Sequence, residues 1–162
     1  MFTDFVKNVT SGIVSVVTEQ LSVSAAADAV TTCCQQLGWQ INERLSANEI
    51  CLHFDDPLVG TRKVRVNVGK DGVTVGFTVF SEVEIPTQRV PAAALAYLLQ
   101  RNREKFVTWE MAIRDNGNVA FALSYVALAA GLHQHIFKVI CDTMILEAQE
   151  FDARMQKAGL LR

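Results

Sequence analysis

Apolar and polar residues follow two different periods along this chain. Up to Leu37, apolar residues recur every three or four positions, which is the spacing of an amphipathic helix. From Trp39 to Val79 they alternate with polar residues, which is typical of strands that bury one face. The helical spacing returns over residues 91–105 and 132–157, and a second alternating region lies between these two segments.

Four helices are predicted from the helical spacing. They cover about residues 2–21, 22–37, 91–105 and 132–157, and Gly38 stands where a helix commonly ends. The buried stripe of the third helix is expected to contain Leu95, Leu98 and Leu99. The buried stripe of the last helix is expected to contain Leu132, Ile136, Val139, Ile140, Met144, Phe151 and Met155.

Six strands are predicted from the alternation, at about residues 39–42, 50–55, 63–68, 73–79, 107–114 and 118–125. Gly69-Lys70-Asp71-Gly72 predicts a tight turn after the third strand, because its glycines can adopt positive φ. Asp115-Asn116-Gly117-Asn118 is a strong hairpin signal between the last two strands. Connections this short imply antiparallel neighbours.

The predicted order of elements is α-α-β-β-β-β-α-β-β-α. Strands grouped apart from helices favour an α+β fold over a doubly wound parallel sheet. We therefore expect an antiparallel sheet with helices packed mainly on one face. The length of 162 residues suits a single domain, residues 1–162, in which residues 1–21 add an N-terminal amphipathic helix.

The outward positions of three predicted strands carry small residues. These are Gly76, Thr78, Ala112, Ala120, Ala122 and Ser124. A sheet face of this kind often lies under another layer. The cover is expected to be either the first helices of the same chain or another molecule.

Charge argues against nucleic acid as a partner. The chain has 15 basic and 17 acidic residues, a formal charge of −2, whereas nucleic-acid binding depends on basic surfaces. Arg62, Lys63 and Arg65 form the main basic cluster, and we expect them on the solvated face of a strand.

The cysteines and the N-terminus indicate a cytoplasmic protein. Cys33, Cys34, Cys51 and Cys141 show no metal-ligand spacing and are expected to be reduced thiols. Asp4 stands where a signal peptide would be basic, and no apolar run is long enough to span a membrane.

One pair of residues offers a candidate for catalysis. Cys51 and His53 point to the same face of a predicted strand, so a cysteine nucleophile with a histidine base is one hypothesis. The alternative is an ordinary polar strand face. His133 and His135 are two apart on a helix, a spacing that does not let them share a metal, and no metal or cofactor is expected.

Carboxylates and one asparagine are expected to have structural or solvated roles. Asp55-Asp56 falls in a turn, while Glu82 and Glu84 share an exposed strand face. Asn102, at a helix end and flanked by solvated Arg101 and Arg103, is expected to cap carbonyls or form a left-handed turn. None of the common nucleotide-binding or hydrolase motifs occurs.

The segment from Leu98 to Leu128 resembles a known pattern. Leu98-Leu99-Gln100-Arg101-Asn102 ends a helix, and a hairpin on Asp115-Asn116-Gly117-Asn118 and a long amphipathic helix follow. This resembles class I type III secretion chaperones and the related YbjN-like bacterial domains, in which a leucine-leucine-x-x-asparagine helix precedes a hairpin and a closing helix. The likeness in pattern covers about residues 24–158.

The resemblance implies a one-sheet α+β fold, homodimers and protein binding without catalysis. Secretion chaperones of this family hold an extended segment of a client along apolar patches. This chain departs from them in its extra helix at residues 1–21 and in lacking strong acidity. It is therefore expected to be a chaperone-like domain or a YbjN-like stress or regulatory domain.

The first predicted helix offers a partner-binding surface. Its apolar residues are Phe2, Phe5, Val9, Ile13 and Val16. They could dock on the same chain, swap into a second subunit or lie on a membrane. Membrane binding is disfavoured because Lys7 is the only cation in this helix. Two functions thus remain, a non-catalytic protein-binding domain and a small enzyme that uses Cys51 and His53.

Overall fold

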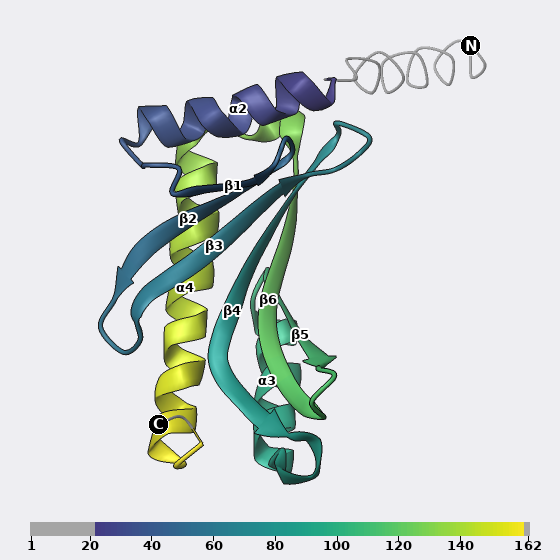
Figure 1. Ribbon diagram of the computed structural model, residues 1–162, viewed down its shortest axis with the longest axis vertical. Helices are drawn as coiled ribbons and strands as arrows, with labels where there is room; N and C mark the ends of the chain where they lie inside the picture. Colours follow the sequence, from purple (N-terminus) through teal and green to yellow (C-terminus); the bar gives the residue numbers. More distant parts are fainter. Residues whose placement is uncertain (1–21, 161–162) are drawn as a thin grey trace, which may run out of the picture.

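Six strands and three α-helices make up residues 22–160, the part of the chain that this computed structural model describes (Figure 1). The helices are α2 (Val23–Gln36), α3 (Ala92–Glu104) and α4 (Gln134–Lys157). The strands are β1 (Glu43–Ser46), β2 (Glu49–Asp56), β3 (Gly60–Val68), β4 (Thr74–Pro86), β5 (Thr108–Ile113) and β6 (Asn118–Leu128). The helix expected at residues 2–21 lies outside the described residues.

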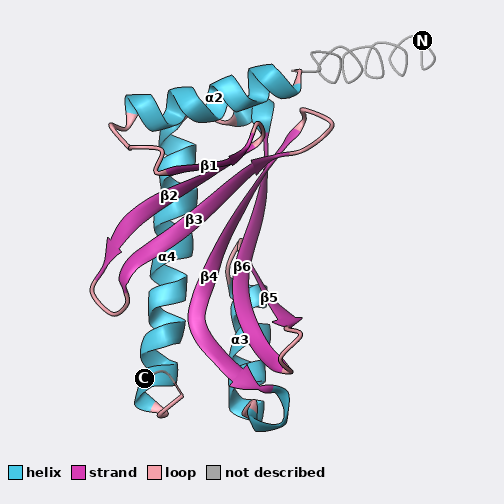
Figure 2. Ribbon diagram, viewed as in Figure 1, coloured by secondary structure: helices cyan, strands magenta, loops and turns pink. Residues whose placement is uncertain are grey.

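The strands form one antiparallel sheet in the order β1-β2-β3-β4-β6-β5. In Figure 2, α4 runs behind the sheet beside α3, and α2 lies across one end. We call the helix-covered side the inner face and the opposite side the outer face. The predicted α+β fold, with helices mainly on one face, is confirmed.

Local sequence explains where several elements begin and turn. The hydroxyl of Ser22 accepts a hydrogen bond from the backbone N–H of Ala25 at 3.2 Å, which caps the start of α2. Gly38, which follows the C-cap residue Leu37 of α2, has φ of 68°, and Gly117 in the β5–β6 turn has φ of 78°. Glycine adopts this left-handed conformation without steric cost.

The first strand was predicted four residues too early. Trp39 and Ile41 precede β1 and pack against the core from an irregular segment. The ring of Trp39 lies 4.9 Å from that of Phe54 and 5.9 Å from that of Phe137. Trp39 and Ile41 alternate with polar residues because both contact the core, although residues 39–42 are not part of a strand.

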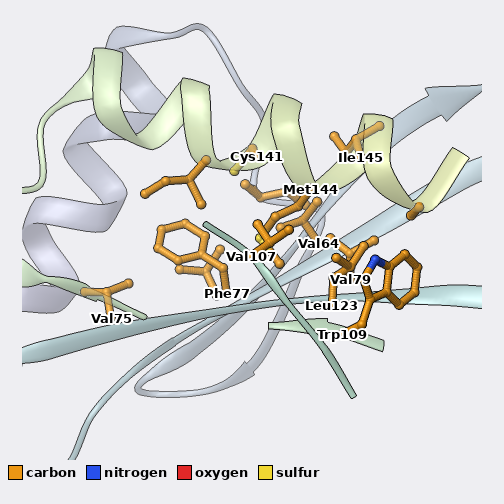
Figure 3. Close-up of a cluster of buried hydrophobic side chains, with 14 of the residues drawn as sticks. Val64, Val75, Phe77, Val79, Val107, Trp109, Leu123, Cys141, Met144 and Ile145 are labelled. Atoms are coloured by element: carbon orange, nitrogen blue, oxygen red, sulfur yellow. The ribbon is translucent and has the colours of Figure 1, made fainter. Parts of the chain in front are cut away.

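The core lies between α4 and the inner face of the sheet (Figure 3). Phe77 from β4 and Phe137 from α4 meet there with ring centroids 5.4 Å apart. Further along α4, the Phe151 ring lies 5.1 Å from Phe121 of β6 and 4.7 Å from Trp109 of β5. One helix therefore holds the middle and one edge of the sheet together.

The predicted buried stripes of two helices were partly wrong. Leu99 on α3 is exposed, and so are Ile136 and Val139 on α4. Phe137 and Cys141 fill the core positions on α4 instead. Neighbouring helix positions differ by about 100°, so apolar residues one position from the buried stripe point to solvent.

Arg62 corrects the prediction of a solvated basic cluster. Lys63 and Arg65 are exposed as expected, but the Arg62 side chain is completely buried on the inner face. Its Nε atom lies 2.9 Å from Oδ2 of Asp56, and its Nη1 atom lies 2.7 Å from Oδ2 of Asp152. Asp56 is therefore also buried, contrary to the solvated role predicted for it.

Asp152 of α4 also ties down an irregular part of β4. The pairing of β4 with β6 shifts between Phe80 and Glu84, which marks a bulge. Within it, the Ser81 hydroxyl donates to Oδ1 of Asp152, and the backbone N–H of Glu82 donates to Oδ2 at 3.3 Å. The bulge is thus fixed to the closing helix through one carboxylate.

Candidate functional site

The free edge of β5 is partly occupied by Asn102 of α3. The backbone N–H of Trp109 donates to Oδ1 of Asn102 at 2.6 Å, and Nδ2 of Asn102 donates to the Trp109 carbonyl oxygen at 3.1 Å. The role of Asn102 is structural, as predicted, but it bonds a strand and not the carbonyls of its own helix. Alternate residues direct their backbone groups to the same side of a strand. Those of Met111 and Ile113 therefore face the free edge as well.

Exposed apolar side chains surround this edge. Met111 is 53% exposed and Ile113 is 72% exposed, whereas Trp109 on the same strand face is buried. Leu99, which is 71% exposed, lies three residues before Asn102 and so on a neighbouring part of the α3 surface. We call Leu99, Met111 and Ile113, together with the free edge of β5, the β5 edge patch. An exposed apolar edge strand is a template for pairing with another chain.

Replacing Asn102 with alanine is expected to lower the free energy of unfolding by about 2 kcal/mol, because both backbone groups of Trp109 lose their partner. Urea unfolding measures this change. Arg103→Ala is the matched control, since Arg103 is exposed on the next position of α3. Equal losses for the two variants would show that the amide bridge contributes nothing.

The outer face of the sheet carries the small residues predicted for it. Thr78 pairs with Ser124, Gly76 with Val126, and Ala112 with Ala120. Among residues 22–160, the helices pack on the inner face, so α2 is not the cover that the sequence left open. Val126 and Leu128 on the outer side of β6 are 62% and 64% exposed.

The structure brings Cys51 and His53 together with a residue that the sequence did not single out. Glu43 on β1 stands directly opposite Cys51 on β2. The side-chain donor atoms of Glu43, Cys51 and His53 all lie within 4.8 Å of one another. Oε1 of Glu43 lies 2.8 Å from Nε2 of His53 and 2.9 Å from Nζ of Lys63. We call these three potential ligands the Glu43–Cys51–His53 cluster.

The electrostatics of this cluster do not favour a nucleophilic thiolate. Burial, followed by the charge of Glu43, raises the pKa of Cys51. Hydrogen bonds from Lys63 and His53 lower the pKa of Glu43, so this carboxylate is ionised. A catalytic cysteine needs the opposite change, because the thiolate is the reactive form.

We expect no cysteine of the native protein to react rapidly with a thiol reagent. All four are unpaired and buried, and burial also raises the pKa of Cys34 to about 11. Thiol titration should find less than one fast-reacting group in the native protein and four after denaturation. A thiol that reacts as fast as free cysteine, and is lost in Cys51→Ser, would restore the nucleophile hypothesis.

The remaining candidates lie apart from one another. His133 and His135 are exposed at the start of α4, with parallel rings 6.5 Å apart. Glu82 and Glu84 are exposed as predicted. Arg101 was predicted to be solvated, but its side chain is only 16% exposed and pairs with the buried Glu147 of α4.

The partner-binding residues predicted from the first helix lie outside the described residues. They are Phe2, Phe5, Val9, Ile13 and Val16. Their binding role therefore stays a prediction. Within residues 22–160, none of the helices has the length and apolar character needed to cross a membrane.

Comparison with known proteins identifies the fold but no family. No family model matches the sequence, and a search of curated proteins finds no match. The solved structure of YbjN from E. coli, described as a proposed transcription regulator, has a TM-score of 0.57 at 15% identity. The alignment covers 83% of this chain and 94% of that one.

Two further structures share the same fold. A chain of the ExsC–ExsE complex has a TM-score of 0.56 at 14% identity, over 81% of this chain and 93% of that one. An uncharacterized protein from Methanothermobacter thermautotrophicus has a TM-score of 0.52 at 10% identity, over 83% and 99%. The predicted likeness to type III secretion chaperones and YbjN-like domains is therefore confirmed for the fold.

Proposed function

We propose that this chain, which shares its fold with YbjN and a chain of the ExsC–ExsE complex, is a non-catalytic protein-binding domain with a chaperone-like or regulatory role. The ExsC–ExsE structure supports this proposal because it contains the fold in a protein–protein complex. We further propose that the protein is a homodimer and acts in the cytoplasm, where its unpaired thiols would stay reduced.

The β5 edge patch is the observation that carries the proposal. Within residues 22–160, no strand pairs with its backbone groups beyond Trp109, and two large apolar side chains, Met111 and Ile113, flank them. An extended peptide that pairs with a sheet edge gains main-chain hydrogen bonds, and its side chains gain apolar contacts. The patch thus suits a partner with a short, extended and apolar segment.

The first helix would supply a second binding surface. Phe2, Phe5, Val9, Ile13 and Val16 are spaced as one apolar stripe. We propose that this stripe contacts the second subunit or the partner. Phe5→Asp would place a charge within it and is expected to weaken whichever contact it makes.

Affinity capture from the lysate of the native organism tests the proposal. Ile113→Lys places a charge on the β5 edge and is expected to abolish capture of a partner that the unmodified protein retains. Leu146→Lys is the matched control, because Leu146 is 59% exposed on α4, away from the edge. Loss of the partner in both variants, or in neither, would contradict a role for the edge patch.

Light scattering tests the oligomeric state separately. We expect a dimer at micromolar concentrations, and a shift toward monomer in Phe5→Asp if the first helix joins the subunits. A strict monomer across this range would contradict the homodimer while leaving partner binding to be decided by the capture experiment.

The alternative, a small enzyme that uses Cys51 and His53, has weaker support. The cluster supplies a thiol, an imidazole and a carboxylate, but the pKa of the Cys51 thiol is raised by its burial. The thiol titration described above distinguishes this alternative from a binding domain.

A further inference from the structure

The Glu43–Cys51–His53 cluster offers a sulfur, a nitrogen and an oxygen ligand at one point of the outer face. Cys51 and His53 are two apart on β2, so their side chains leave the strand on the same side. Glu43 reaches the same point from β1, where it pairs with Cys51. Neighbouring strands of a sheet thus fix all three Cα positions without help from a loop.

We propose that Glu43, Cys51 and His53 bind one zinc ion. Cysteine sulfur, histidine nitrogen and carboxylate oxygen are the ligands that zinc takes in proteins, at bond lengths of about 2.0–2.3 Å. A tetrahedron with such bonds separates its ligand atoms by roughly 3.5 Å. The three donor atoms lie within 4.8 Å of one another, so side-chain rotation alone would close the site.

The three ligands differ in their exposure to solvent. The Cys51 side chain is buried, while the side chains of His53 and Glu43 are 27% and 39% exposed. A zinc ion above the thiol would therefore keep one position open toward solvent, and water would be its fourth ligand. On binding, the Cys51 S–H bond gives its proton to solvent and the sulfur bonds the metal, with no change of oxidation state.

Neighbouring residues support the position of the histidine. The backbone N–H of His53 donates to Oδ1 of Asn42 at 2.8 Å, and the N–H of Asn42 donates to the carbonyl of Cys51 at 3.1 Å. These bonds fix the backbone that carries two of the ligands.

Lys63 is the competitor that a metal must displace. Its ammonium lies 2.9 Å from Oε1 of Glu43, and its side chain is 55% exposed and so free to move away. The cluster therefore already holds one positive charge beside the carboxylate. Removing that charge is expected to strengthen zinc binding, an effect that general damage to the protein would not produce.

The test uses the full chain, stripped of metal and without a histidine tag. Cobalt(II) is added first, because a cysteine ligand gives an intense sulfur-to-cobalt absorption in the near ultraviolet. Zinc affinity is then measured by competition with a coloured chelator. We expect one metal per chain, loss of the absorption in Cys51→Ser, and zinc binding weakened about tenfold or more in His53→Ala and Glu43→Gln.

Two further variants test whether the metal binds at this cluster and not elsewhere on the protein. Lys63→Met is expected to bind zinc about threefold more tightly, since the competing ammonium is gone. A variant with both His133→Ala and His135→Ala is expected to bind as the unmodified protein does. Circular dichroism checks that each variant is folded. If Cys51→Ser does not fold, Glu43→Gln replaces it as the variant that tests loss of a ligand. The absence of the cobalt absorption, its survival in Cys51→Ser, or loss of metal only in the His133 and His135 variant would overturn the proposal.

Discussion

Asp152→Ala is expected to lower the free energy of unfolding by about 3–5 kcal/mol, because it leaves a buried guanidinium with one of its two carboxylate partners. Arg62 is completely buried, and Asp152 accepts a hydrogen bond from it at 2.7 Å. The same substitution removes the acceptor for the Ser81 hydroxyl. Urea denaturation of the two proteins at neutral pH measures the difference.

A carboxylate on the same helix provides the control. Asp142 pairs with Lys138, and both side chains are nearly half exposed, so Asp142→Ala should cost about 0.5 kcal/mol or less. Combining Arg62→Met with Asp152→Leu should cost less than the sum of the single substitutions, because each single substitution leaves the other member of this buried ion pair without its partner. A loss below about 1 kcal/mol for Asp152→Ala would show that Arg62 is adequately stabilised by Asp56 alone.

Phe151→Ala is expected to destabilise the protein by a similar amount, about 3–5 kcal/mol. The Phe151 ring is completely buried and contacts three other rings: Tyr97 on α3, Trp109 on β5 and Phe121 on β6. Alanine would leave a cavity where three elements meet. Thermal and urea unfolding together measure the loss.

Leu146→Ala tests whether the loss comes from burial. Leu146 lies on the same helix but is 59% exposed, so its truncation should change the free energy of unfolding by about 0.5 kcal/mol or less. Phe151→Leu, which refills part of the cavity, should fall between the unmodified protein and Phe151→Ala. Equal effects for Leu146→Ala and Phe151→Ala would contradict the central place of this ring in the core.

Alternation along the strands was sufficient to predict most of the sheet. The alternation also indicated that Arg62 is buried, but its charge and its basic neighbours led to the prediction of a solvated cluster. Arg62 is in phase with Val64, Val66 and Val68, all of which are buried on the inner face. A charged residue at a position that alternation predicts to be buried implies a buried partner of opposite charge. That partner, Asp152, is 90 residues away in the sequence, and only the fold places it beside Arg62.

Other features depended on tertiary contacts that periodicity does not encode. Leu99 and Ile136 lie beside the buried stripes of their helices, and the packing direction of each helix decides which apolar neighbour is covered. Glu43 was missed because the first strand was placed at residues 39–42. Without the correct strand, its register opposite Cys51 could not be predicted.

The amide of Asn102 limits how the sheet can grow. A bare strand edge accepts partners in several registers and can be extended by copy after copy, which leads to fibres. Here the backbone of Trp109 is already bonded to Asn102, and at the other end β5 itself stops at Ile113. Among the described residues, only the short stretch around Met111 and Ile113 leaves its outward backbone groups without a strand partner. A segment that adds to this edge would therefore be short and would pair in one register, which favours selective binding over open-ended polymerisation.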